Sequence, residues 1–471
     1  MARFFSSIFM HFHFIGICGT AMGSVAAALR ELGHEVSGSD ASPYPPMSTF
    51  LEEKGVTISE GYRGENLPSD SEAVIVVGNA ISRGNEELEA ALSGRLFYTS
   101  LPEVIKNHFL RGRRNLVVTG THGKTTTSSM LAWILKDSGQ NPSWMIGGIP
   151  ANLGDGCFLG GGDIVVLEGD EYDTAFFDKR SKFVHYLPEV VIVNNVEFDH
   201  ADIFDDLDAI KLAFRRMLNI VPQNGVVFVN GDCENSLAVA NGCPAQVVTV
   251  GMSEGCAMRI TELEMGSRHS AFSVDGCRYE ISQEGEFNVR NAAMAVCAAS
   301  FVGAGSKQIG KALADFHGVA RRQQLRGEVH GVRVIDDFAH HPTAIRGAIA
   351  ATRQRFPGAR IWALFEPRSN TTRRSILQTE LTEALASADR AVVASVARAM
   401  QLDDKERLDP DQVVADLKAG GTVAYHEADA DAIVMRIVPD LRDADVVVVF
   451  SNGAFGGIHQ KLLDALEQRV S

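Results

Sequence analysis

The sequence lacks the features that mark membrane, secreted or nucleic-acid-binding proteins. No apolar run reaches the roughly 18 residues needed to span a bilayer as a helix. Its seven cysteines are scattered, odd in number and free of any CxxC or Cys/His zinc spacing, so we expect reduced thiols in a cytosolic protein. The 44 Lys and Arg residues are outnumbered by 59 Asp and Glu, and the net charge of −15 disfavours binding to nucleic acids or anionic membranes.

The N-terminal segment also lacks the marks of a signal peptide. ARFFSSIFM carries one positive charge and no AxA-type cleavage site, and it leads directly to an apolar run of strand type at 11–16. We therefore do not expect secretion. Met10 is an alternative start, which would make residues 1–9 a structurally idle extension.

The chain contains enough material for several ordinary globular domains. It has 471 residues, 45% of them hydrophobic and 22% charged, and roughly 150 residues per domain gives about three domains. Apolar runs of strand length alternate with helix-length amphipathic segments, which predicts α/β domains with parallel sheets. We place the domains at 1–112, 113–325 and 326–471, with some antiparallel pairing at 257–282 of the second.

The clearest motif is TGTHGKTTT at 119–127, between an apolar run of strand type and an expected helix. Gly120 and Gly123 let the backbone approach a ligand closely, and free amides and the helix dipole converge on one point that suits a phosphate. Lys124 would reach the β and γ phosphates, and the Thr125 hydroxyl would coordinate Mg²⁺. Only two residues separate the glycines, compared with four in GxxxxGK[ST], so a glycine-rich turn without a ligand is the alternative.

Acidic residues follow two apolar strands of the second domain, in LEGDEYD at 167–173 and NNVEFDHAD at 194–202. Residues at the carboxyl ends of parallel strands face the crevice where α/β sheets bind ligands. Mg²⁺ prefers oxygen ligands, so Glu168 is a candidate metal ligand and His200 a candidate for a second metal position. Taken singly, the remaining acids are better interpreted as solvating loops: Asp170, Glu171, Asp173 and Asp202.

The first domain carries GICGTAMG at 16–23 between a strand and a helix, and Asp40 ends the next strand. This arrangement resembles a dinucleotide fingerprint, in which glycines admit a pyrophosphate and an acid binds a ribose hydroxyl. Cys18 and Ala21 stand where GxGxxG has glycine, so an NAD site is weakly supported. Another pyrophosphate, or a tight turn without a ligand, remains open.

Three segments of the third domain also follow strands, namely DDFAHHP at 336–342, EPRSNT at 366–371 and SNGAFGGIH at 451–459. Neighbouring histidines on one chain do not normally point at one ion, so DDFAHHP favours substrate or nucleotide contact over a metal site. The Arg368 guanidinium matches a carboxylate, and the Ser-Asn-Gly turn offers backbone donors. Arg321 and Arg322 either bind a nucleotide phosphate or lie on the solvated surface.

In combination these motifs resemble the Mur ligase family of cell-wall synthesis. GTHGKTT, the EGDEYD acids, NxxxDHxD at 195–202, GxxNxxNA at 285–292, the arginine pair and DDFAHHP occur in the order found in that family, over nearly the whole chain. The resemblance implies a Rossmann-like N-terminal domain that binds a UDP sugar, a central P-loop ATPase domain with a mixed sheet, and a Rossmann-like C-terminal domain that binds a peptide.

The resemblance also implies an ATP- and Mg²⁺-dependent ligase of peptidoglycan recycling in the cytoplasm. ATP would phosphorylate the carboxylate of UDP-N-acetylmuramate, and an amine would attack the acyl phosphate. GSDASPYPPMSTFLEEKGV, FAHHPTAI, EPRSNT and SNGAFGGIHQ favour the tripeptide L-alanyl-γ-D-glutamyl-meso-diaminopimelate as that amine, with free L-alanine as the alternative. We expect a monomer or a weak homodimer.

Carried over residue by residue, the resemblance implies these roles. The catalytic residues are Lys124, Glu168 and His200. The metal ligands are Thr125, Glu168 and His200. The ATP-binding residues are Gly120, Thr121, His122, Gly123, Lys124, Thr125, Thr126, Asn291, Arg322 and Asp337. The UDP-sugar-binding residues are Gly16, Cys18, Gly19, Thr20, Met22, Gly23, Ser39 and Asp40. The peptide-binding residues are Arg368, Ser369, Asn370, Ser451, Asn452 and His341.

Two positions depart from the family pattern. Family members commonly have histidine where this chain has Phe287, so a polar nucleotide contact is lost or replaced by stacking. Several relatives bridge two metals with a carbamylated lysine, for which Lys211 is only a weak candidate. Two functions of a different class remain as alternatives: an NAD-dependent oxidoreductase, and a regulatory P-loop ATPase that binds a partner without joining two substrates.

Overall fold

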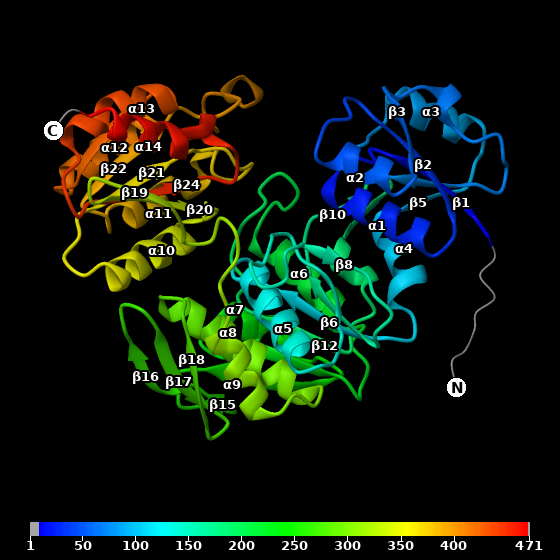
Figure 1. The fold of residues 1–471 in the computed structure, drawn as a ribbon, viewed down its shortest axis with the longest axis horizontal. Helices are drawn as coiled ribbons and strands as arrows, with labels where there is room; N and C mark the ends of the chain where they lie inside the picture. The colour runs from blue at the N-terminus through cyan, green and yellow to red at the C-terminus, as the bar shows by residue number, and fades with distance from the viewer. Residues whose placement is uncertain (1–8, 470–471) are drawn as a thin grey trace.

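The computed structural model describes residues 9–469, which form three α/β domains (Figure 1). The N-terminal domain (blue) and the C-terminal domain (orange and red) lie side by side above the central domain (cyan to green). Of the extension expected at residues 1–9, all but Phe9 lies outside the described residues. Within 9–469, no helix is both long enough and apolar enough to cross a membrane.

The N-terminal domain is built on a five-stranded parallel sheet of order β3-β2-β1-β4-β5. Its strands are β1 (His11–Ile15), β2 (Glu35–Asp40), β3 (Thr57–Glu60), β4 (Val74–Val77) and β5 (Tyr98–Ser100). Its helices are α1 (Thr20–Glu31), α2 (Met47–Glu53), α3 (Glu86–Ser93) and α4 (Leu101–Ile105). The glycine-rich turn at 16–19 joins β1 to α1, so it lies at the carboxyl edge of the sheet.

The central domain has an eight-stranded sheet of order β15-β14-β13-β12-β6-β9-β7-β8, parallel except at β8. Its strands are β6 (Arg114–Thr119), β7 (Ser143–Met145), β8 (Cys157–Phe158), β9 (Ile164–Glu168), β12 (Val190–Val193), β13 (Val226–Asn230), β14 (Gln246–Gly251) and β15 (Met258–Arg259). Its helices are α5 (Lys124–Asp137), α6 (Leu207–Leu218), α7 (Glu234–Ala240), α8 (Glu286–Phe301) and α9 (Ser306–Ala314).

Two smaller antiparallel units belong to the same domain. They are the hairpin β10 (Asp173–Ala175) and β11 (Asp178–Ser181), and the sheet β16 (Thr261–Met265), β17 (Ser270–Val274) and β18 (Cys277–Ile281). The antiparallel pairing expected at 257–282 is therefore confirmed, although it forms a sheet of its own.

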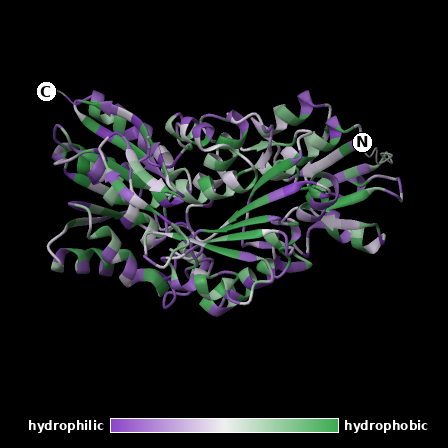
Figure 2. Cartoon of the chain, turned by 90° about the horizontal axis from the view of Figure 1, so that it is seen from below, coloured by the Kyte–Doolittle hydropathy of each residue, from purple (hydrophilic) through white to green (hydrophobic). Residues whose placement is uncertain are grey.

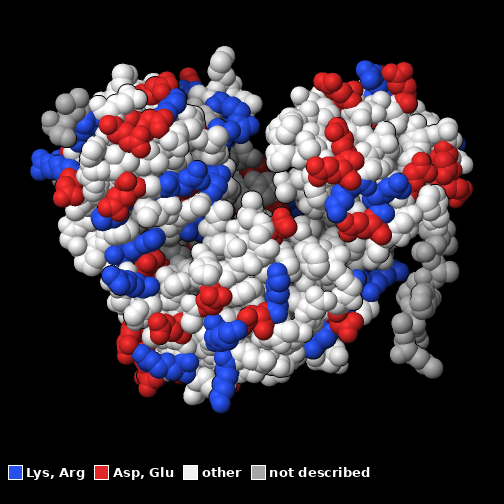
Figure 3. Space-filling view, viewed as in Figure 1, with Lys and Arg blue, Asp and Glu red and all other residues white. Residues whose placement is uncertain are grey.

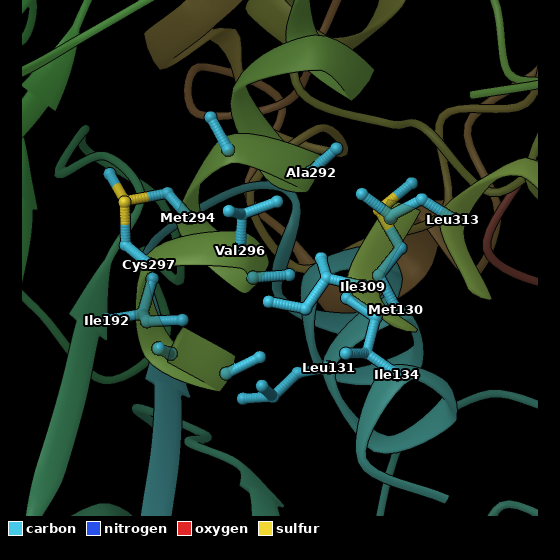
Figure 4. Close-up of a cluster of buried hydrophobic side chains, with 14 of the residues drawn as sticks. Met130, Leu131, Ile134, Ile192, Ala292, Met294, Val296, Cys297, Ile309 and Leu313 are labelled. Atoms are coloured by element: carbon cyan, nitrogen blue, oxygen red, sulfur yellow. The ribbon is translucent and has the colours of Figure 1, made fainter. Parts of the chain in front are cut away.

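The largest core joins this sheet to α5, α8 and α9. Helix α8 buries residues 292–299, five of which are alanines, and these small side chains let α5 approach closely. Figure 4 shows the packed side chains, among them Met130 and Ile134 of α5 with Ile309 and Leu313 of α9. Figure 2 shows the hydrophobic strands of the central sheet running through the middle of the molecule. This core fixes the position of the first turn of α5.

The C-terminal domain has a six-stranded sheet of order β19-β20-β24-β21-β22-β23, in which only β19 is antiparallel to its neighbour. Its strands are β19 (Gln324–Val329), β20 (Val332–Asp337), β21 (Ile361–Phe365), β22 (Arg390–Ala394), β23 (Val423–Glu427) and β24 (Val446–Phe450). Its helices are α10 (Pro342–Arg355), α11 (Gln378–Leu385), α12 (Pro410–Ala419), α13 (Ala430–Ile437) and α14 (Ile458–Glu467). The three predicted segments follow β20, β21 and β24, which are neighbours.

Candidate active site

A cavity of about 920 Å³ lies between the central and C-terminal domains. Its walls come from the phosphate loop and the first turn of α5 at 121–126, the segments after β9 and β12, helix α8, and the segment joining β20 to α10. Figure 3 shows the surface hollowed where the two upper domains face each other, with Lys and Arg side chains on the C-terminal side. A cavity of this volume is large enough for a nucleotide.

The phosphate loop has the geometry that anion binding requires. Gly123 has a φ of 78°, in the left-handed region, and a Cβ there would lie 2.5 Å from Asn291 Oδ1. The N-terminus of α5 has no side-chain cap, so its first-turn amides are available to a ligand. Lys124 Nζ donates to Gly120 O at 2.7 Å, which folds the lysine back over the loop. The loop could therefore hold a phosphate chain.

The two oxygen ligands predicted for Mg²⁺ are in direct contact. Thr125 Oγ1 donates to Glu168 Oε1 at 2.9 Å, and the Gly147 amide donates to Glu168 Oε2 at 2.6 Å. The Arg322 guanidinium donates to Thr125 Oγ1 at 3.2 Å. A hydroxyl and a carboxylate at the mouth of a phosphate loop match the oxygen donors that Mg²⁺ prefers, so these residues fit that ion.

Glu171 corrects one sequence prediction. We expected it to solvate a loop, but its side chain is only 3% exposed and its Oε1 lies 2.9 Å from both Lys124 Nζ and His200 Nε2. Burial disfavours its charge, but Lys124 and His200 together outweigh burial and lower the pKa of Glu171. Its Oε2 is buried without a hydrogen-bond partner. Glu171 therefore belongs to the site.

The other three acids of these motifs form ion pairs or hydrogen bonds. Asp170 pairs with Lys182, Asp173 with Lys179, and Asp202 accepts from Asn370 of the C-terminal domain.

His200 lies beside the phosphate loop, but it contacts Glu171 and not Glu168. Its backbone has a φ of 56°, which turns the chain after Asp199 toward the loop. Burial disfavours the imidazolium, and the hydrogen bond and charge of Glu171 reverse this effect and raise the pKa of His200. Thr125, Glu168 and His200 thus lie at one site, joined through Lys124 and Glu171.

The nucleotide residues predicted farther along the chain reach the same cavity. Asn291 of α8 lies against Gly123, and Asp337 at the end of β20 accepts from the Gln323 and Ala339 amides. Burial raises the pKa of Asp337. The Arg322 guanidinium lies 4.9 Å from the Phe338 ring centroid. Cavity walls also include Thr121, His122, Thr126 and Phe287.

Residues of the two domains meet in a second cluster of the cavity. His122 Nε2 lies 3.2 Å and His341 Nδ1 lies 3.4 Å from Glu197 Oε2. Burial and the adjacent His122 lower the pKa of His341 to about 4. Nearby, Thr371 Oγ1 donates to Asp199 Oδ1 at 2.7 Å across the domain boundary. We predicted that His341 contacts the peptide. In the structure it lies beside His122 of the phosphate loop.

The N-terminal motif forms a separate site outside the cavity walls. The Cys18 amide donates to Asp40 Oδ2 at 2.9 Å, so the turn and the acid come together as predicted. Gly16, with a φ of 88°, donates its amide to Ser39 O. Gly19 precedes α1, which begins at Thr20 and includes Gly23. Met22 and Ser39 are buried, so their side chains face the domain interior.

The remaining peptide candidates gather at the ends of β21 and β24. Arg368 Nη1 lies 3.4 Å from Glu366 Oε1, and the Ser451 hydroxyl donates to the other carboxylate oxygen of Glu366. Asn452 follows in the same turn. Ser369 hydrogen-bonds Thr372 at 2.8 Å, and Asn370 Nδ2 donates to Asp202 Oδ2 at 2.7 Å. Carboxylate recognition by this arginine would require exchange of its Glu366 partner.

Several residues of the site were not predicted from the sequence. Glu197 and Asp199, which line the cavity, and Glu171, which contacts Lys124, lie within the segments that we singled out, and their position after β9 and β12 was a usable signal. Thr371 was missed as a contact because its partner Asp199 is 172 residues away.

The fold and the site together define a three-domain ligase in which a central phosphate-loop domain is flanked by two α/β domains. The chain belongs to the Mur ligase family. Its residues 11–113 match the model described as Mur ligase family, catalytic domain, residues 118–299 match the Mur ligase middle domain, and residues 321–453 match the Mur ligase, glutamate ligase domain.

Individual relatives are similar over nearly the whole chain. The UDP-N-acetylmuramate–L-alanyl-γ-D-glutamyl-meso-2,6-diaminoheptandioate ligase of Escherichia coli is 43% identical, covering 98% of this chain and 99% of its own. A UDP-N-acetylmuramate–L-alanine ligase of Kineococcus radiotolerans is 34% identical, covering 97% and 96%. The crystal structure of a murein peptide ligase from Psychrobacter arcticus is 36% identical, with a TM-score of 0.71, covering 98% of this chain and 100% of that one.

Proposed function

We propose that this enzyme is an ATP-dependent ligase that joins the tripeptide L-alanyl-γ-D-glutamyl-meso-diaminopimelate to the carboxylate of UDP-N-acetylmuramate. One observation supports the tripeptide over L-alanine as the amine substrate. Identity to the tripeptide ligase of Escherichia coli is 43%, compared with 34% for the L-alanine ligase of Kineococcus radiotolerans, at nearly equal coverage. Because the chain belongs to the Mur ligase family, we do not propose that it is an oxidoreductase or a regulatory ATPase.

The central cavity would bind the ATP that activates the carboxylate. Gly120, Thr121, His122, Gly123 and Thr126 would surround the phosphates, and Lys124 would neutralise charge during transfer of the γ-phosphoryl group. Asn291, Arg322 and Asp337 would contact the nucleoside. The close approach of Gly123 to Asn291 supports this assignment, because a side chain at position 123 would collide with Asn291 and only a glycine backbone fits there.

Magnesium would be held by Thr125 and Glu168, with His200 at a second position, and would supply charge neutralisation on the phosphate oxygens. Glu171 holds Lys124 and His200 together in this structure. Because Glu171 contacts both side chains, we assign it to positioning Lys124 and His200. When Lys124 binds phosphate, it must give up part of its ion pair with Glu171.

The reaction would proceed through an acyl phosphate. A muramoyl carboxylate oxygen attacks the γ-phosphorus, and ADP leaves. The peptide amine then attacks the acyl carbon and loses a proton, and inorganic phosphate leaves as the amide bond forms. Phosphate is a far better leaving group than oxide, which is why the carboxylate must be activated before the amine attacks.

The substrates would enter from the flanking domains. Gly16, Cys18, Gly19, Thr20, Met22, Gly23, Ser39 and Asp40 form the proposed UDP-sugar site, where the turn and Asp40 are joined by the Cys18 amide. Met22 and Ser39 would act by shaping the turn, because both are buried. Arg368, Ser369, Asn370, Ser451 and Asn452 form the proposed peptide site, and His341 would contact the peptide from its position beside the phosphate loop.

The remaining assignments are also proposals. We place the domains at 1–112, 113–325 and 326–471, supported by the separate sheets, although β19 begins at Gln324 and pairs with β20 of the third sheet. We propose a cytoplasmic enzyme of peptidoglycan recycling that acts as a monomer or a weak homodimer.

The amine substrate can be tested directly. The enzyme is incubated with ATP, Mg²⁺ and UDP-N-acetylmuramate together with either the tripeptide or L-alanine, and the nucleotide-sugar products are identified by mass spectrometry. We expect a product only with the tripeptide, with phosphate release that requires both acceptor and amine. Efficient ligation of L-alanine alone would favour the alternative substrate.

A further inference from the structure

We propose that His122, Glu197 and His341 form a binding site for a zinc-class divalent ion, distinct from the oxygen-rich magnesium site at Thr125 and Glu168. Among residues 9–469, these three form a group whose candidate ligand atoms all lie within 4.8 Å of one another. Two imidazole nitrogens and one carboxylate oxygen make the donor set that Zn²⁺ and similar ions take in open sites with three protein ligands.

Two of the three distances between the donor atoms match tetrahedral coordination, and the third lies within 4.8 Å. Bonds of roughly 2.0–2.1 Å to a tetrahedral metal place neighbouring ligand atoms about 3.3 Å apart. Glu197 Oε2 lies 3.2 Å from His122 Nε2 and 3.4 Å from His341 Nδ1. The two imidazole rings have centroids 4.4 Å apart and are tilted by 42°, and each has one nitrogen near the carboxylate.

The hydrogen bonds of His341 leave its Nδ1 as an acceptor directed toward a carboxylate. Its Nε2 faces the Phe198 carbonyl at 3.2 Å and must therefore donate, which fixes the tautomer. Its Nδ1 accepts a long hydrogen bond of 3.3 Å from the Thr343 amide, and the same atom faces Glu197 Oε2. Each of the two atoms also accepts from Thr343, Nδ1 from its amide and Glu197 Oε2 from its hydroxyl, and in the neutral ring their mutual repulsion is relieved when a proton or a metal ion lies between them. The carbonyl contact to Nε2 is the outer support typical of metal-binding histidines.

The three ligands come from parts of the chain that only the fold brings together. His122 belongs to the phosphate loop, Glu197 follows β12, and His341 caps the N-terminus of α10 in the C-terminal domain. All three line the 920 Å³ cavity, so an ion can enter and keep an open coordination position. The adjacent His340 faces Asp199 at 3.6 Å and not this group. A bound ion would therefore connect the phosphate loop to the C-terminal domain.

Cobalt absorbance tests the site without any turnover. Full-length enzyme is freed of metals with a chelator, supplied with excess Mg²⁺ to fill the oxygen sites, and titrated with Co²⁺. We expect intense visible absorbance, typical of four-coordinate Co²⁺, that saturates at one equivalent and disappears on addition of Zn²⁺. Absence of this signal in the wild type would overturn the proposal.

Two conservative variants show which side chains bind the ion. Glu197→Gln keeps an acceptor for the Thr343 hydroxyl, which now lies 2.7 Å from Glu197 Oε2, and His341→Asn keeps a side-chain cap for α10. Each should weaken Co²⁺ binding at least 10-fold, while His269→Ala, at an exposed histidine of the central domain, should not. Unchanged binding in both site variants would overturn the proposal, whether or not the tripeptide is the substrate.

Discussion

At the scale of single residues, the account depends most on Lys124. Its ammonium is 2.9 Å from Glu171. Burial disfavours the charge of Lys124, but the charge and hydrogen bond of Glu171, together with Asp170 and Glu168, outweigh burial and raise the pKa of Lys124, so the side chain stays charged. Lys124→Ala should reduce phosphate release about 1,000-fold, since a preorganised cation at the transferring group is lost. UDP-sugar binding should be retained, because that site lies in another domain.

Phosphate release and calorimetry of UDP-N-acetylmuramate check this prediction. Lys311→Ala is the matched control, since Lys311 is an exposed lysine of α9 paired with Asp137. Normal turnover by Lys124→Ala would mean that the loop has been assigned wrongly.

The sequence predicts the residues of the phosphate loop but not the distant residues that contact them. Lys124, Thr125 and the flanking glycines were predictable because they form one local motif between a strand and a helix. Glu171 was not, because its role depends on Lys124, 47 residues earlier, and on His200, 29 residues later. The pairing of His122 with His341 likewise requires the docking of two domains, which spacing along the chain does not encode.

At the scale of elements, the turn before α5 gives a sharp test. Gly123 and Gly139 both have a φ of 78°, but a Cβ at Gly123 would meet Asn291, whereas a Cβ at Gly139 meets nothing within 4 Å. Changing either to alanine should cost about 1–2 kcal/mol of stability through backbone strain. Only Gly123→Ala should also weaken ATP binding, by at least 10-fold in calorimetry. Equal ATP affinities of the two variants would contradict the proposed loop geometry.

The hairpin β10–β11 gives a pH-dependent prediction. The Arg180 hydrogen bond lowers the pKa of Asp178 to about 2, and Asp178 also accepts from His185, which contacts Glu103 of α4. A lowered carboxyl pKa stabilises the fold above its unfolded pKa of 3.8, and this contribution is lost as pH falls toward 2.

Asp178→Asn should therefore destabilise the protein by about 1–2 kcal/mol at pH 7. The deficit, measured by denaturant unfolding, should shrink between pH 5 and pH 3. Glu264→Gln, at an exposed acid paired with Arg278, serves as the control. A deficit that does not change with pH would refute the assignment.

At the scale of elements most of the fold was predictable, because buried parallel strands and amphipathic helices alternate clearly in the sequence. The helix expected at GICGTAMG is α1, found at Thr20–Glu31. The order of strands was not predictable. It places β24 between β20 and β21, and this order brings Asp337, Glu366 and Ser451 to one edge of the sheet.

At the scale of the whole molecule, the three domains must bring their substrates together at one place. The cavity joins the central and C-terminal domains, while the glycine-rich turn of the N-terminal domain lies outside its walls. Contacts across the boundary, such as Thr371 with Asp199 and Asn370 with Asp202, hold the C-terminal domain against the central one. Activated muramoyl carboxylate and peptide amine must therefore meet near the phosphate loop, where the domains converge.

Transfer of a carboxylate oxygen to phosphate would show whether the reaction passes through an acyl phosphate. UDP-N-acetylmuramate labelled with ¹⁸O in its muramoyl carboxylate is ligated to the tripeptide with ATP and Mg²⁺, and the released phosphate is analysed by mass spectrometry. An acyl phosphate predicts that each molecule of phosphate carries one ¹⁸O atom from the carboxylate and that the amide keeps the other. Unlabelled phosphate alongside normal ligation would contradict the account.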